Sequence, residues 1–373
     1  MQFSEFVLKG LLKDENSYLA GYLGERLPYW WFARNAQKKH GKLIVKLPPE
    51  YDREIRRYWK ERLGVSIKTY CHQYFYASNG VEDVRYIPED VFFKYLLRKF
   101  NRLSFAKPYA DKNFYDRLFS GAKTPATVVR NINGNFYDEE YNALDEHKAV
   151  RMVLEALQET RVVVKPSIDS GGGRNVSLLD ISRFSDSLAK AELELRETLK
   201  KYNKDYIVQR FLEQSALLNQ IYPCSLNTIR IVSVACGSKI DVLARVLKMG
   251  NNSGFLDKVS MGGLSIGIDE HGRLHRHGFL ADVTAPVSVH PYSKFEFAGT
   301  VIPNFNEVLD FVKRLHRRIE PYFRFVSWDI ALDKNNNPVL VEVNLRYQGI
   351  MIPQLNCGPL FGDKTEVVLA SLR

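Results

Sequence analysis

The chain contains 373 residues, of which 45% are hydrophobic and 26% are charged, and its formal net charge is +10. This composition is typical of a soluble globular protein, and the length predicts about two or three domains. No apolar run approaches the roughly 18 residues that a membrane span requires, and the start of the chain lacks the pattern of a secretory signal. The positive charge favours acidic partners such as nucleotides, sugar phosphates, nucleic acid or an anionic membrane surface.

The first hundred or so residues are rich in aromatic side chains and predict an accessory unit that is α/β or mainly helical. A short strand is expected at Leu43 to Leu47, and a helix is expected from Pro88 to about Phe100. Between them lies a predicted amphipathic helix, whose basic face carries Arg53, Arg56, Arg57 and Lys60. We interpret this face as solvated, and because no signature of an RNA-binding module accompanies it, no nucleic-acid partner is expected.

A loop at Ala106 to Ala110 is expected to close this unit. Beyond it, apolar periodicity predicts further helices: one capped by Asp145, one over Ser187 to Lys200, and one over Asn306 to Ile319. The cysteines are scattered and lack the spacing of metal ligands, which indicates free thiols in a reducing cytoplasm; they are Cys71, Cys224, Cys236 and Cys357.

A glycine-rich hairpin is expected between the strand Arg161 to Pro166 and the strand Val176 to Leu179. Its tip can bind an anion, because consecutive glycines let the backbone approach closely and offer several N–H groups; the tip residues are Ser170, Gly171, Gly172 and Gly173, with Arg174 beside them. Lys165 at the strand end strengthens this hypothesis. The alternative is a flexible hairpin tip, which shares the triple glycine.

Two later strand regions offer further polar groups. Tyr206 to Leu212 is a predicted strand whose exposed backbone could contact an adenine, although a plain strand fits equally well. Asn227 to Cys236 and Ile240 to Leu247 are expected to pair, and they carry Arg230 and Arg245 within apolar runs. A buried arginine requires an anionic partner, either an acidic side chain of the protein or a substrate phosphate or carboxylate.

The last hairpin, Trp328 to Asn344, predicts a cation site. If Leu332 pairs with Val339, then Asp329 faces Glu342, and strand alternation places Asn344 on the same side. Two carboxylates about 5 Å apart repel by roughly 3 kcal/mol at an effective dielectric near 20. Oxygen ligands of this kind suit Mg²⁺ that also holds phosphates, whereas the alternative is a surface hairpin with solvated acids.

Taken in order, "DKNFYDRLF", "VVVKPSIDSGGGRNV", "YIVQRFLEQ", "NTIRIVS" and "SWDIALDKNNNPVLVEVN" resemble the successive elements of an ATP-grasp enzyme. The resemblance covers about Lys107 to Gly362, and it is nearest to the sugar-transfer-associated ATP-grasp group. It implies an α/β (α+β) fold in which two lobes clasp ATP. We therefore expect an accessory unit at residues 1–106 and an ATP-grasp core at 107–373, with lobes at about 123–215 and 216–373.

The resemblance also implies roles for individual residues. Lys112 and Lys165 would contact ATP phosphates under the glycine tip, Gln209 and the Leu212 backbone would contact the adenine, and Gln214 would reach the ribose. Asp329, Glu342 and Asn344 would hold one or two Mg²⁺ ions. Arg230 and Arg245, with Lys165, would act on the transferred group, and a substrate loop would include Ser260, Gly262, Gly263 and Arg346. Where the family commonly has an acidic residue, this chain has Gln209.

These implications favour a cytoplasmic, ADP-forming ligase that uses ATP and Mg²⁺ to join a carboxylate to an amine through an acyl phosphate. The carboxylate would belong to a sugar, peptide or amino acid, with a role in surface-polysaccharide assembly. One alternative is an ATP-grasp kinase that phosphorylates a hydroxyl or carboxylate, and another is a nucleotide-binding scaffold without turnover. Oligomeric state does not follow from the sequence.

Overall fold

The computed structural model describes residues 45–168, 175–251, 262–280 and 285–370. The chain divides into two compact units, Met1–Lys99 with Gly358–Arg373, and Phe100–Cys357. The predicted division into residues 1–106 and 107–373 stays a prediction. None of the described helices is both long enough and apolar enough to cross a membrane.

The described part of the first unit is helical. Its elements are α3 (Pro49–Leu63), α4 (Tyr70–Asn79), α5 (Glu89–Val91), the π-helix η1 (Phe92–Leu96), α6 (Leu97–Phe100), η6 (Gly362–Lys364) and α14 (Thr365–Ala370). In α3, Tyr51, Ile55 and Trp59 are buried while the basic residues face outward, as predicted for an amphipathic helix. The expected strand at Leu43 to Leu47 is wrong for its described part, because residues 45–48 precede α3 without regular structure.

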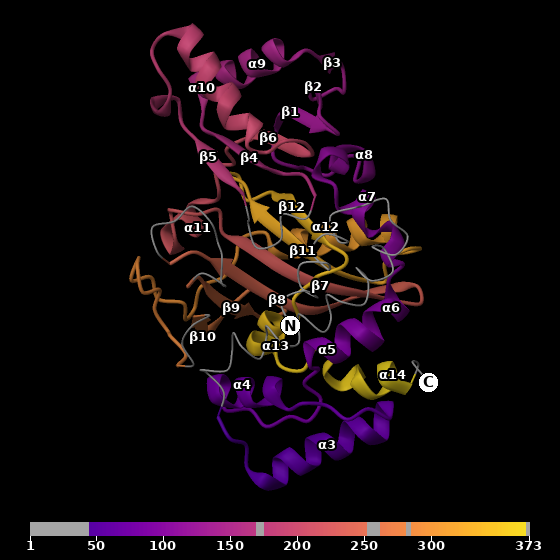
Figure 1. The fold of residues 1–373 in the computed structure, drawn as a ribbon. Coiled ribbons are helices and arrows are strands. Elements are labelled where there is room, and N and C mark those ends of the chain that lie inside the picture. The colour runs from indigo at the N-terminus through magenta and orange to yellow at the C-terminus, as the bar shows by residue number, and fades with distance from the viewer. Residues whose placement is uncertain (1–44, 169–174, 252–261, 281–284, 371–373) are drawn as a thin grey trace, which may run out of the picture. The chain divides into compact units, whose positions relative to one another are not determined.

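The second unit contains two antiparallel sheets (Figure 1). The first has the strand order β3-β2-β1-β6-β4-β5. Its strands are β1 (Thr127–Ile132), β2 (Asn135–Tyr137), β3 (Ala143–Leu144), β4 (Val162–Pro166), β5 (Ser177–Leu179) and β6 (Tyr206–Arg210). Helices α9 (Glu146–Glu159) and α10 (Leu188–Lys200) lie side by side against this sheet.

The helix predictions for this part are confirmed in detail. Asp145 caps α9 by accepting a hydrogen bond from the Lys148 N–H, and Ala149, Val153 and Leu157 are buried. The hairpin of β4 and β5 is confirmed as well, because Val162 to Val164 pair with Leu179 to Ser177. Its glycine tip, with Ser170 and Gly171 to Gly173, lies outside the described residues.

The second sheet has the strand order β10-β9-β8-β7-β11-β12. Its strands are β7 (Thr228–Cys236), β8 (Lys239–Met249), β9 (Leu264–Ile268), β10 (Leu274–Leu280), β11 (Phe325–Leu332) and β12 (Pro338–Asn344). One face packs against α12 (Phe305–Ile319), whose apolar stripe enters the largest described core together with Trp328 and Ile330. Helix α13 (Met351–Cys357) packs against β8 and β9.

Short helical segments connect these layers. They are η2 (Leu103–Phe105), α7 (Ala106–Ala110), η3 (Lys112–Phe114), α8 (Tyr115–Leu118), η4 (Ile181–Arg183) and α11 (Ala216–Ile221). The predicted loop at Ala106 to Ala110 is therefore wrong, since these residues form α7. Five residues give too short a window for apolar periodicity to mark a helix.

The hairpin of β11 and β12 has a register that differs in part from the prediction. Leu332 pairs with Pro338 rather than with Val339, and Ile330 pairs with Leu340. A register shift at Val341 then adds one residue to β12, so that Asp329 does pair with Glu342. The predicted pairing of the two carboxylates is confirmed, although the register from which it was predicted, with Leu332 opposite Val339, is wrong.

Candidate functional site

The candidate site is a cluster of charged side chains on the face of the second sheet opposite α12. Asp329 and Glu342 form a cross-strand pair, and Arg230 is the partner of Asp329 on β7. Because residues that pair directly across strands point to the same face, all three side chains emerge together. Asn344 follows Glu342 by two residues and shares this face.

Asp329 is held by two basic side chains. Arg230 forms a fork to both of its oxygens, at 2.6 and 2.7 Å, and the Lys248 ammonium lies 3.3 Å from Oδ1. Burial by itself would raise the pKa of the Asp329 carboxyl, but Arg230 and Lys248 hold it well below its usual range. Asp329 is therefore ionised, and its remaining lone pairs can still accept a further ligand.

Glu342 is held by a lysine from outside its own sheet. The Lys112 ammonium lies 2.8 Å from Glu342 Oε1, and the Lys112 side chain is only 5% exposed. Lys112 stands at the start of η3, where its own N–H donates to the Ser167 carbonyl beside the glycine hairpin. Burial would raise the pKa of Glu342, yet it is lowered because the effect of Lys112 outweighs it.

Lys165 completes the cluster from the end of β4 in the first sheet. Burial lowers the pKa of its ammonium to about 7. Repulsion from Lys112 also lowers this pKa, whereas attraction to Glu342 raises it. Lysines from the first sheet and from η3 thus act electrostatically on carboxylates of the second sheet. With Arg230 and Lys248 included, basic groups outnumber acidic ones, so the cluster suits an anionic ligand.

The structure does not bring every predicted residue into this cluster. Arg245 pairs with Ile231, whereas Arg230 pairs with Val246, so alternation along β8 sends Arg245 to the face opposite Lys248. The Gln214 amide is engaged elsewhere. Its nitrogen donates to Asn219 Oδ1, the Tyr222 carbonyl and the Ser225 carbonyl, and its oxygen accepts from the Asn227 N–H.

Lys248 is the residue that the sequence reasoning missed. It belongs to β8, and its pairing with Thr228 places it on the face of Arg230. Nothing in the sequence distinguished it from the exposed lysines of this basic chain. Only the register between β7 and β8 could have identified it.

The predicted adenine contacts lie at the end of β6. The Gln209 side chain is buried and donates to the Pro125 carbonyl at 3.1 Å, while its Oε1 makes no hydrogen bond within the described part of the chain. Leu212 follows β6 and lines a hollow of about 450 Å³ together with Phe211, Arg161 and Ala216. Of the predicted substrate loop, Ser260 lies outside the described residues, and Gly262 and Gly263 precede β9.

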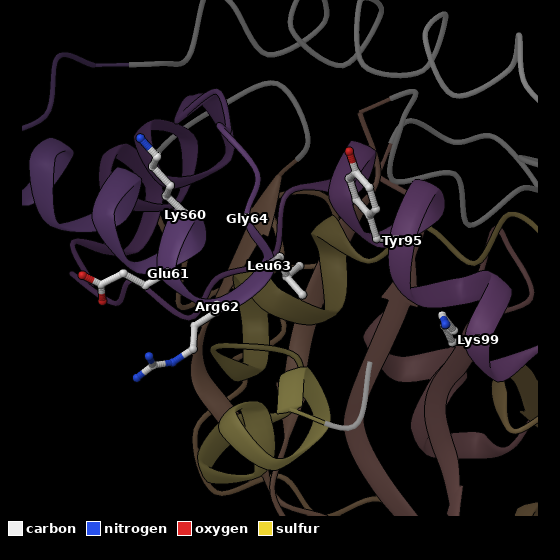
Figure 2. Close-up of a pocket in the computed structure, with 7 residues that line it drawn as sticks. All are labelled: Lys60, Glu61, Arg62, Leu63, Gly64, Tyr95 and Lys99. Atoms are coloured by element: carbon white, nitrogen blue, oxygen red, sulfur yellow. The ribbon is translucent and has the colours of Figure 1, made fainter. Parts of the chain in front are cut away.

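Another hollow, of about 470 Å³, lies in the first unit between the end of α3 and the helix that carries Tyr95 and Lys99. Figure 2 shows that the charged ends of Lys60, Glu61 and Arg62 point away from one another. Arg62 also pairs with Glu366 at 2.5 Å. Because the polar groups do not converge, this hollow is not a candidate site.

Comparisons with known proteins show the family to which the chain belongs. Residues 92–367 match the family described as sugar-transfer associated ATP-grasp. Among curated proteins, none matches the chain. Solved structures that resemble it include an L-amino acid ligase from Bacillus licheniformis, with 13% identity, a TM-score of 0.38, and coverage of 71% of this chain and 48% of that one. A D-cycloserine synthetase has 12% identity, a TM-score of 0.43, and coverage of 73% and 72%.

A phosphoribosylamine–glycine ligase from Thermotoga maritima has 13% identity and a TM-score of 0.40. The match covers 76% of this chain and 56% of that one. The chain thus spans about half of the first and third of these structures. Similarities of this strength carry no information about substrate.

Proposed function

The chain belongs to the sugar-transfer-associated ATP-grasp family, and on that premise we propose that it is an ATP- and Mg²⁺-dependent ligase that joins a carboxylate to an amine. The observation that carries the proposal is the convergence of Lys112 and Lys165 on the paired carboxylates Asp329 and Glu342. Such an arrangement supplies positive charge for phosphates and oxygen ligands for a metal ion in one place.

We place the nucleotide along the line from the end of β6 to this cluster. The free Oε1 of Gln209 can accept a hydrogen bond from the amino group of adenine, and the Leu212 backbone offers the neighbouring contact. The segment after β6 reaches the end of β11, because Gln214 and Asp333 form a bridge. From there the phosphates would extend toward Lys112, Lys165 and Arg230.

The residues present fit a magnesium ion. Asp329 and Glu342 offer carboxylate oxygens and Asn344 an amide oxygen, all on one sheet face. Among the described residues, no group of three or more histidine, cysteine, aspartate or glutamate side chains could hold a metal. The ion would therefore depend on Asn344 and on ATP oxygens as well. When bound, Mg²⁺ would neutralise charge on the phosphates as the acceptor approaches.

The proposed reaction has two steps. A carboxylate oxygen of the acceptor attacks the γ-phosphorus of ATP, an O–P bond forms, the bond to the β,γ-bridging oxygen breaks, and ADP leaves with the electron pair. Lys112, Lys165 and Arg230 offset the charge on the phosphoryl oxygens. The amine then attacks the acyl carbon, the C–O bond to phosphate breaks, and inorganic phosphate leaves while the nitrogen loses its proton to solvent.

A carboxylate acceptor fits this site better than a hydroxyl acceptor. A hydroxyl must lose its proton to a base. Bound phosphate would favour the charged form of Lys165, which leaves Asp329 and Glu342 as the candidate bases. Both carboxyls have lowered pKa values and are held by basic side chains, so they are poor bases. A carboxylate needs no such base. This argues for the ligase over a kinase that acts on a hydroxyl.

The biological setting is inferred from the family and from the cysteines. A family associated with sugar transfer supports a sugar-linked carboxylate or amine and a role in polysaccharide assembly. Cys71, Cys224, Cys236 and Cys357 form no disulfide, which supports a reducing cytoplasm, where ATP is available.

Calorimetric titration of ATP, with and without Mg²⁺, tests the site. We expect Mg²⁺ to strengthen ATP binding in the wild type but not in Glu342→Gln. Glu366→Gln in the first unit is the matched control and should behave as the wild type. An unchanged Mg²⁺ effect in Glu342→Gln would remove the metal assignment.

Release of ADP separates ligase from kinase once an acceptor is known. A ligase should need both the carboxylate and the amine for full turnover, with amide as the product. Full turnover with the carboxylate alone, and phosphorylated acceptor as the product, would favour the kinase.

A further inference from the structure

Beyond the pair of Asp329 and Glu342, buried polar atoms gather at the Ser327 end of the same sheet face. Ser327 Oγ, Asn344 Nδ2, Arg346 Nε and Gln348 Oε1 are shielded from solvent and make no hydrogen bond to any described residue. Leaving a buried donor or acceptor unsatisfied costs about 1–3 kcal/mol. Native proteins keep such groups rare, and a cluster of them indicates a place where a ligand supplies the partners.

Pairing and hydrogen bonds place three of these groups near one another, and Arg346 follows Asn344 by two residues, with Leu345 between them in the core. Ser327 pairs directly with Asn344, so their side chains are neighbours on the site face. Gln348 contacts β11 and β7: its Nε2 donates to the Phe325 carbonyl at 3.4 Å, and its own carbonyl accepts at 3.0 Å from Arg230 on β7, the partner of Asp329. The Ser327 side chain is 1% exposed and that of Gln348 is fully buried.

The position of this group along β11 has a functional meaning, which rests on the proposed function. The strand runs from Phe325, past Ser327 and Asp329, to Leu332 beside the segment that follows β6. If the nucleotide base lies near that segment and the phosphates lie at Asp329, the next place along the strand is Ser327. Two residues of strand span about 7 Å, which is comparable to the length of a small acid.

The chemistry of the four groups describes their ligand. Ser327, Asn344 and Arg346 offer hydrogen-bond donors, which suit the oxygens of a carboxylate. The carbonyl oxygen of Gln348 is an acceptor and needs an N–H or O–H group on the ligand. Its orientation is fixed by the hydrogen bond from Nε2 to Phe325.

We propose that Ser327, Asn344, Arg346 and Gln348 form the acceptor subsite, and that it selects carboxylic acids with a hydroxyl or amino group on the carbon next to the carboxylate. Ser327 and Arg346 hold the carboxylate, and Gln348 distinguishes the substituted acid from the plain one. A site built to hydrogen-bond a substrate hydroxyl rejects the analogue that lacks it, because its own polar group is then left unpaired.

The test uses pairs of acids that differ only in the α-substituent: glycolate and glycine against acetate, lactate and alanine against propionate, malate against succinate, and gluconate against 2-deoxygluconate. Each acid is incubated with full-length protein, ATP, Mg²⁺ and hydroxylamine. Hydroxylamine attacks the acyl phosphate, releasing inorganic phosphate and leaving a hydroxamate that can be measured beside ADP. We expect kcat/KM for a substituted acid to exceed that of its plain counterpart by about 10- to 100-fold.

Variants assign the effect to the subsite. Gln348→Met keeps the length of the side chain but removes the acceptor, so the preference for the substituted acid should fall toward equality. Ser327→Ala should raise KM for both members of a pair by a similar factor. Gln354→Met, at an equally buried glutamine on α13, controls for folding and should leave the preference unchanged.

Two outcomes overturn the inference while leaving the proposed function intact. One is equal use of both members of every pair, or a preference that survives in Gln348→Met. The other is ATP binding that Mg²⁺ strengthens, with no hydroxamate from any acid in the panel. Failure to bind ATP at all would instead refute the proposed function.

Discussion

Lys165 gives the most direct test of the proposed phosphate site, because we expect its protonation to change if ATP binds there. Burial lowers the pKa of its ammonium to about 7, so the side chain is charged below pH 7 and neutral above it. A bound phosphate favours the charged form. Above pH 7, ATP binding should therefore take up a proton, and affinity should fall as the pH rises.

The size of the effect follows from the two pKa values. If bound ATP returns the lysine to about its ordinary value of 10.5, the dissociation constant of ATP should rise about tenfold between pH 6 and pH 8. That change corresponds to about 1.4 kcal/mol. The proton uptake per ATP should increase from about 0.1 at pH 6 to about 0.9 at pH 8.

Calorimetry in two buffers that differ in ionisation enthalpy measures the proton uptake. Lys165→Arg is the matched control, because a guanidinium stays charged over this range and ATP contributes its own protonation equally to both proteins. The difference between wild type and variant then belongs to Lys165. Equal proton uptake by the two proteins at pH 8 would refute either the lowered pKa or the contact with phosphate.

Two further predictions concern contacts that hold the site in shape. Arg230→Met leaves the buried Asp329 with Lys248 alone and should lower the free energy of unfolding, measured by urea denaturation, by about 3 kcal/mol. The double variant with Asp329→Asn should lose less stability than the sum of the two single variants. Additive losses would contradict the ion pair. Tyr115→Phe removes the hydrogen bonds that the Tyr115 hydroxyl donates to the Ala110 carbonyl and accepts from the Val343 N–H, next to Glu342. It should weaken ATP binding in Mg²⁺ severalfold, whereas the control Tyr58→Phe in the first unit should not. Equal affinities of the wild type and Tyr115→Phe would show that Tyr115 does not position the site.

Local patterns predicted the four longest described helices, α3, α9, α10 and α12, because each signal lies within one element. The Asp145 cap predicted where α9 begins, and the apolar stripe predicted which of its residues are buried. The short helix α7 was not predicted, because its five residues carry no periodicity and its helical form depends on the surrounding structure. The expected strand at Leu43 to Leu47 rested on β-branched and apolar residues alone, which also suit an extended segment leading into a helix.

The candidate site was harder to predict because its members come from different strands. Asp329 and Glu342 could be paired from one hairpin, where the turn limits the register. The choice between Arg245 and Lys248 required the register of β8 against β7, which no turn signal supplied. Gln214 was expected to contact the ribose, but its amide is hydrogen-bonded to residues of the segment that precedes β7.

The extra residue at Val341 has a consequence for how this hairpin tolerates changes in length. The turn from Asp333 to Pro338 and the carboxylate pair lie on opposite sides of that residue, so the turn can vary in sequence without moving Glu342. Deleting Val341 would leave Leu340 and Glu342 adjacent, opposite the adjacent Ile330 and Asp329. Regular alternation would then keep Leu340 in the core and Glu342 on the site face, so the hairpin should also tolerate a single-codon deletion there.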